Sequence, residues 1–103
     1  RAEFDNSFSQ CDVLISPTAT KTAFSFDYEI KDPVEGYKAD ICTVPVNMLG
    51  LCAISIPCGV GNDKLPVGLQ IIGNKFCESR ILNLAYNFEQ NFQWSLPKMG
   101  VLV

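Results

Sequence analysis

The chain has 103 residues, of which 48% are hydrophobic and 18% are charged, and its net charge is -3. This composition is typical of one packed domain or part of one, and it excludes a disordered segment. The basic residues are scattered, which excludes the basic patch of a direct nucleic-acid binder. No apolar run approaches the roughly 18 residues that span a bilayer, so we expect no membrane partner. The polar start without Met disfavours a signal peptide and indicates a cut rather than a natural terminus.

Five elements are predicted in the first half of the chain and at its centre. A helix is expected over residues 2–10, with Phe4 and Phe8 on one face. A buried strand over 13–15 follows, ended by a Ser-Pro pair, and then a loop with an edge strand over 18–30. The Asp-Pro pair at 32–33 favours a short helix that reaches about Asp40, and the Val-Pro pair at 44–45 favours a second helix. We expect this second helix to stop at the glycine in position 50.

Two strands and a longer helix are predicted in the second half. A strand over 52–56, a turn cluster over 58–63 and a strand over 66–72 favour a hairpin. The helix over 78–92 is the clearest element, and the tail over 93–103 is expected to be irregular. The apolar face of the helix over 78–92 is formed by residues at helical spacing: Ile81, Ala85, Phe88 and Phe92.

The interleaved strands and helices predict an α/β fold. The strands over 13–15 and 52–56 are apolar at both alternating positions, which is typical of strands covered on both faces. Two or three helices cannot supply that cover. We therefore expect an incomplete sheet that continues in residues outside this chain.

The cysteines and the absence of histidine limit the chemistry of the chain. No pair has Cys-x-x-Cys spacing, so we expect no metal and no other cofactor. Thiols beside apolar residues are typically buried and reduced, which favours the cytoplasm or an organelle such as a mitochondrion or plastid. The five cysteines are Cys11, Cys42, Cys52, Cys58 and Cys77.

No catalytic residue is assigned from the sequence. Without histidine, Ser-His-Asp and Cys-His arrangements are excluded, and the lysines lie in polar contexts away from any Gly/Ser-rich turn. Cys58 follows a strand, but no neighbouring group would activate its thiol, so a small residue before a turn is the preferred interpretation. The Cys58-Gly59-Val60-Gly61 segment also lacks the third glycine and the helix start of a nucleotide-binding loop.

Asp40 is the candidate binding residue. It lies among apolar residues at the junction of the two short predicted helices. A carboxylate at such a place can bind an ammonium group through a charge-assisted hydrogen bond. Two other interpretations stay open on the local sequence, namely a cap for the following helix and an ordinary exposed carboxylate.

Three strings of the sequence resemble the C-terminal end of the amidase signature family. They are DVLISPTAT at 12–20, DPVEGYKADICTVPVNMLGLCAISIPCG at 32–59, and LPVGLQIIG with the following helix over 65–90. They occur in order and cover most of the chain. The Asp-Pro…Tyr…Asp-Ile-x-Thr-Val-Pro segment most resembles the branch formed by the A subunits of glutamyl-tRNA(Gln) amidotransferases.

The resemblance implies a fold and an activity. The family fold is one α/β/α domain around a mixed central sheet, and residues 1–103 would be a C-terminal fragment of it. Members of this branch hydrolyse glutamine, and the ammonia passes to a partner subunit that converts Glu-tRNA(Gln) to Gln-tRNA(Gln) after ATP activation. The implied partners are the B and C subunits of the complex, with the tRNA contacted only indirectly.

The resemblance also implies roles for particular residues. The nucleophilic serine, its cis-serine and lysine, and the arginine that holds the substrate carboxylate all correspond to positions upstream of this chain. The acidic residue that receives the substrate α-ammonium matches Asp40. Departures from the family pattern are Cys52, where Pro is usual, and Val46, where Ala is common. Two alternatives stay open: another amide hydrolase of this family, and a non-catalytic assembly element.

Overall fold

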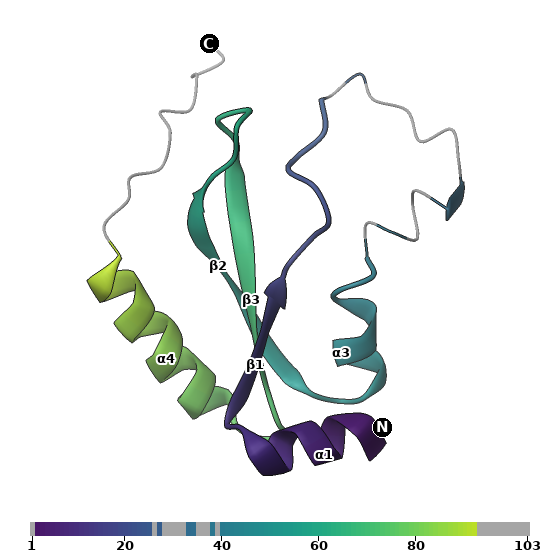
Figure 1. Cartoon of the computed structure of the whole chain (residues 1–103), viewed down its shortest axis with the longest axis vertical. Helices are drawn as coiled ribbons and strands as arrows, with labels where there is room; N and C mark the ends of the chain where they lie inside the picture. The colour runs from purple at the N-terminus through teal and green to yellow at the C-terminus, as the bar shows by residue number, and fades with distance from the viewer. Residues whose placement is uncertain (1, 26, 28–32, 35–37, 39, 93–103) are drawn as a thin grey trace.

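The computed structural model of the chain describes residues 2–25, 27, 33–34, 38 and 40–92. The predicted helix over 32–40 and the tail over 93–103 lie mostly or wholly outside the described residues. The described elements, in chain order, are α1 (Ala2–Gln10), β1 (Val13–Pro17), α3 (Val44–Met48), β2 (Cys52–Val60), β3 (Pro66–Gly73) and α4 (Glu78–Asn91) (Figure 1). This interleaving of helices and strands confirms the predicted α/β class.

The three strands form one antiparallel sheet in the order β1-β3-β2, with β3 in the centre. The predicted hairpin is confirmed, because β2 and β3 follow each other in the chain and pair antiparallel. The register places Ile71 of β3 opposite Ile15 of β1 on one side and Ile54 of β2 on the other. Residues directly opposite in an antiparallel pair share a face, so these three isoleucines point to the same side.

Two strands run further than predicted. β1 continues through Pro17, and β2 continues past Pro57 to Val60 through a register shift between Pro57 and Gly59. The Ser-Pro pair was expected to end the first strand and the second was expected over 52–56, and both expected ends were wrong. Both strands are edges of the described sheet, where a residue without an N–H can be accommodated and a bulge absorbs the irregularity.

One face of the sheet is covered by α4 (Figure 1). Ile71 from β3 and Ile81 and Ala85 from α4 form the buried core, with Ile71 only 2% exposed. The surrounding side chains are half-buried and pack against this core: Val13, Cys52, Ile54 and Ile56. The main buried cluster is therefore the contact between the helix and this face of the sheet, while Ile72 of β3 and Val46 of α3 are buried outside it.

The predicted apolar face of α4 is confirmed for most of its length. Ile81 and Ala85 are buried, and Phe88 is half-buried. Phe92 was expected on the same face, but it is 59% exposed. The helix ends at Asn91, so Phe92 takes an extended conformation and stacks on Phe88 with ring centroids 4.4 Å apart. No helix among the described residues is both long and apolar enough to cross a membrane.

The short helix α3 lies on the opposite side of the strands from α4 (Figure 1). It begins after Thr43, with Pro45 in its first turn, and Val46 is buried. Gly50 follows the helix with φ +67°, the left-handed conformation that ends helices and favours glycine. The predicted helix start and stop are both confirmed. In the segment predicted as a loop, the described residues 18–25 form no strand.

Candidate functional site

A row of polar side chains crosses the face of the sheet opposite α4. Ser16, Gln70 and Ser55 are directly opposite one another in β1, β3 and β2. Gln70 is buried, with only 4% of its surface exposed. Its Nε2 donates hydrogen bonds to Ser16 Oγ at 3.0 Å and to the carbonyl of Cys42 at 2.8 Å. The row therefore contacts the chain segment that precedes α3.

That segment is a turn over residues 40–43 that carries Asp40. The Asp40 carbonyl accepts hydrogen bonds from the backbone N–H groups of Thr43 at 3.1 Å and Val44 at 3.0 Å. Thr43 Oγ1 donates to the same carbonyl at 3.3 Å. Thr43 occupies the N-cap position of α3 and makes no side-chain cap hydrogen bond. Asp40 is exposed, and within the described part of the chain its carboxylate has no hydrogen-bond partner, so the backbone fixes the turn while the carboxylate faces solvent.

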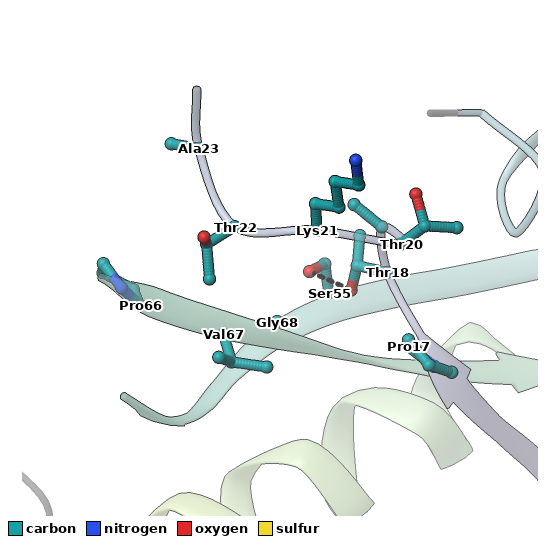
Figure 2. A pocket seen from close by; sticks show the side chains of 11 residues that line it. Pro17, Thr18, Thr20, Lys21, Thr22, Ala23, Ser55, Pro66, Val67 and Gly68 are labelled. Atoms are coloured by element: carbon teal, nitrogen blue, oxygen red, sulfur yellow. Dashed lines mark hydrogen bonds between the residues drawn. The ribbon is translucent and has the colours of Figure 1, made fainter. Parts of the chain in front are cut away.

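A pocket of about 420 Å³ lies between the segment after β1 and the hairpin (Figure 2). The pocket wall contributes several hydroxyl groups and one ammonium group. Its lining residues are Pro17 at the end of β1, Thr18, Ala19, Thr20, Lys21, Thr22 and Ala23 from the segment after it, and Ser55, Pro66, Val67 and Gly68 from the hairpin. These hydroxyls can donate and accept hydrogen bonds.

Three threonines at alternate positions attach the segment 18–22 to the rest of the molecule. Thr18 Oγ1 and Ser55 Oγ share a hydrogen bond of 2.7 Å, drawn in Figure 2. Thr20 Oγ1 donates to the carbonyl of Lys38 at 3.3 Å, close to Asp40 in the sequence. The third threonine, Thr22, donates to a carboxylate oxygen of Asp63 in the turn of the hairpin. The pocket wall is thus joined to β2, to the neighbourhood of Asp40 and to the hairpin turn.

Sequence reasoning missed these threonines and Gln70. The threonines alternate in TATKT, but the segment is a run of bends and its threonines contact three separate partners, so the strand period gives no reliable signal here. Gln70 gave a weak signal, as a polar residue inside the apolar strand β3. Neither its contact with Cys42, 28 positions away, nor the pocket itself is visible in a local pattern.

Asp63 is the described carboxyl with a shifted pKa. The hydrogen bond from Thr22 is the largest cause that holds the Asp63 pKa below its ordinary value of 3.8. The backbone N–H of Leu65 also donates to Asp63 at 3.1 Å and acts in the same direction. Both donors favour the charged form, so Asp63 anchors the pocket wall as a carboxylate.

No nucleophile at or near the pocket is paired with an activating base among the described residues. Within the described residues, Ser55 has Thr18 as its hydrogen-bond partner and no base is hydrogen-bonded to it. The Lys21 side chain extends away from the strands in Figure 2. Cys58 is exposed at the bulge of β2, and its thiol donates to the carbonyl of Val67 at 3.5 Å. A nucleophile needs an adjacent activating group, and none of these side chains has one among the described residues.

The family model described as Amidase matches residues 1–82. The chain is 45% identical over 95 residues to a protein named as the A subunit of glutamyl-tRNA(Gln) amidotransferase from Desulforamulus reducens, covering 92% of this chain and 19% of that protein. A protein of the same name from Prochlorococcus marinus subsp. pastoris is 52% identical over 91 residues, which cover 88% of this chain and 19% of that protein.

The crystal structure of the glutamyl-tRNA(Gln) amidotransferase A subunit from Thermotoga maritima has the same arrangement of elements. It matches with a TM-score of 0.86 and 39% sequence identity, covering 97% of this chain and 23% of that chain. These matches confirm the resemblance to such A subunits, and they confirm that the described fold corresponds to a fragment of theirs. The chain spans about a fifth of the length of the relatives named here. Since the family model covers most of its residues, the chain belongs to the amidase family.

Proposed function

We propose that residues 1–103 form the C-terminal part of a single amidase domain, in a subunit that hydrolyses glutamine. The ammonia released serves the conversion of Glu-tRNA(Gln) to Gln-tRNA(Gln). The similarity to proteins named as glutamyl-tRNA(Gln) amidotransferase A subunits supports this choice over other amide hydrolases. The B and C subunits are the partners that complete the complex, and the tRNA is contacted through them.

The observation that carries the proposal is the position of Asp40. Its carboxylate is exposed, and its turn is held by three hydrogen bonds to its own carbonyl. Thr20 links the wall of the pocket to the backbone of Lys38, close to Asp40 in the sequence. An exposed carboxylate on a turn whose backbone is fixed can accept a charge-assisted hydrogen bond from the α-ammonium of glutamine.

In this proposal the described residues bind the substrate, and bond breaking occurs elsewhere in the full-length protein. Glutamine and water give glutamate and ammonia. A serine outside this chain attacks the side-chain amide, assisted by a second serine and a lysine, and water then releases the glutamyl group. Asp40 contributes by orientation, because holding the α-ammonium fixes how the side-chain amide is presented to the nucleophile.

The test is a kinetic comparison of Asp40→Asn with wild type, using the full-length protein in its complex. The substitution keeps the size of the side chain and removes its charge. Loss of an acceptor for a charged donor costs about 1.5–3 kcal/mol. We therefore expect kcat/KM for glutamine to fall roughly 10- to 150-fold. Glutaramate, which is glutamine without the α-amino group, should be hydrolysed almost equally well by both proteins.

The comparison of the two substrates separates binding from stability. The thermal unfolding midpoint of Asp40→Asn should stay close to that of wild type, because the bonds that hold the turn use the backbone of Asp40. If both substrates lose activity to the same extent, or if only the thermal midpoint falls, Asp40 does not bind the ammonium group and this site is assigned incorrectly.

A further inference from the structure

We infer that Gln70 is a positioning residue for Asp40: its amide ties the turn that carries the carboxylate to the central strand of the sheet. The inference rests on the proposed function of Asp40 and extends it to a residue that does not touch substrate. Gln70 lies on β3, and the residue that it holds in the turn, Cys42, is two positions after Asp40.

The geometry makes Gln70 a rigid support. β3 is paired on both sides, with Ser16 of β1 and Ser55 of β2 directly opposite Gln70. The side chain is 4% exposed, and Nε2 divides its two donors between Ser16 Oγ and the Cys42 carbonyl. A buried side chain with both donors engaged has one favourable orientation.

The hydrogen bond from Gln70 to Cys42 is 2.8 Å long, and among the described residues it is the one that joins a strand to the turn 40–43. The other hydrogen bonds of the turn are local: Thr43 and Val44 donate to the Asp40 carbonyl, Ile41 donates to Lys38, and Asn47 of α3 donates to the Thr43 carbonyl. Such local bonds fix the shape of the turn and join it to α3, but none of them reaches a strand. The Gln70 amide fixes the place of the turn over the sheet, and so it sets where the Asp40 carboxylate meets a ligand.

The residue type matters for this role. A glutamate at position 70 would present oxygen to the Cys42 carbonyl and could not donate when ionised. An asparagine keeps the amide but is one methylene shorter, so it could not span the same 2.8 Å contact from the same backbone position. A methionine has similar length and no donor, and it would leave the Cys42 carbonyl without this partner.

The experiment uses the full-length protein in its complex, with steady-state kinetics on glutamine and on glutaramate. We expect Gln70→Met to raise KM for glutamine about three- to tenfold, the effect of one lost hydrogen bond. The kcat for glutamine and both constants for glutaramate should stay within about twofold of wild type. Gln70→Asn should behave like Gln70→Met, which provides a second variant if one of them assembles poorly.

Ser16→Ala is the matched control. It removes the other hydrogen bond of the Gln70 amide and leaves the bond to Cys42 in place. Its KM for glutamine should rise clearly less than that of Gln70→Met, because the bond to the turn is kept. If Ser16→Ala raises KM as much as Gln70→Met does, the effect comes from general loosening of the sheet and the positioning role is wrong.

A double-mutant cycle with Asp40→Asn separates this inference from the proposed function. If Gln70 acts through Asp40, Gln70→Met should have no further effect on glutamine KM in the Asp40→Asn background. If Asp40→Asn impairs glutamine hydrolysis but the two substitutions combine additively, Asp40 keeps its proposed role and the positioning inference fails. If Asp40→Asn has no effect on glutamine, the proposed function of Asp40 fails and the inference fails with it.

Discussion

Gly73 lies so close to Ile81 that a Cβ atom added to the glycine would be 2.7 Å from Cγ2 of the isoleucine. The same atom would be 3.1 Å from Sγ of Cys52. Gly73 ends β3, and Ile81 is buried in the first turns of α4 with 3% of its surface exposed. The absence of a side chain at position 73 is therefore what allows α4 to approach the sheet at this end.

Gly73→Ala should destabilise the fold by about 1–3 kcal/mol, because the added methyl overpacks a closed contact. The measurement is the thermal or urea midpoint of wild type and variant. Ile81→Ala is the companion change, since it removes the atom that the new methyl would meet. In the Gly73→Ala background, Ile81→Ala should cost less than it does alone. Strictly additive costs would show that the two residues do not compete for the same space.

The pH dependence of the chain should show the hydrogen bond between Thr22 and Asp63. Thr22→Val removes the main donor that lowers the Asp63 pKa, so that pKa should rise towards 3.8. An NMR titration of the Asp63 carboxyl carbon measures this directly. Thr20→Val is the matched control, because Thr20 donates to Lys38 instead. An unchanged Asp63 pKa in Thr22→Val would contradict the assigned hydrogen bond.

The sign of the stability effect follows from the direction of the shift. A carboxyl whose pKa is lower in the folded state adds stability above its unfolded pKa, and this contribution disappears as the pH falls through the folded pKa. Wild type should therefore be more stable than Thr22→Val near pH 6, and part of the difference should vanish below about pH 3.8. Unfolding midpoints measured at both pH values test this. A difference that stays constant or grows on acidification would contradict it.

Sequence patterns predicted the helices and strands well, because the spacing that marks an element lies within that element. The spacing of Ile81 and Ala85 indicated the buried face of α4, and Gly50 indicated the end of α3. The patterns failed where pairing between distant segments decides the outcome. Pro17 and Pro57 stay within strands because β1 and β2 are edges of the described sheet, which a single strand cannot reveal.

The candidate site likewise contains one residue that the sequence indicated and several contacts that it did not. Asp40 could be named from the resemblance of its surrounding segment to a known family. The contact of Gln70 with Cys42 and that of Thr18 with Ser55 join residues 28 and 37 positions apart. Such contacts depend on strand register, and a shift of one residue would turn Gln70 to the opposite face. They could therefore be found only once the register was known.

The chain should self-associate through its apolar sheet edge. Ile15 of β1 lies on the same face of the sheet as Ile71. The helix α4 covers Ile71 but leaves Ile15 66% exposed. Exposed apolar side chains on an edge strand favour pairing with another chain. Ile15→Lys should shift sedimentation equilibrium towards monomer. Phe76→Lys is the control, since Phe76 is 91% exposed in a turn outside the sheet; an equal shift with Phe76→Lys would mean that association is not specific to the edge.

The purified chain should release no ammonia from glutamine or from simple amides. The described residues offer hydroxyls in the pocket, but Ser55 is hydrogen-bonded to Thr18 rather than to a base, and unactivated serine is a weak nucleophile. The measurement is a coupled ammonia assay on highly purified chain, with Ser55→Ala as the paired variant. Release that persists in Ser55→Ala would point to a contaminant. Release that Ser55→Ala abolishes would show that Ser55 is a working nucleophile, and it would overturn the assignment of bond breaking to residues outside this chain.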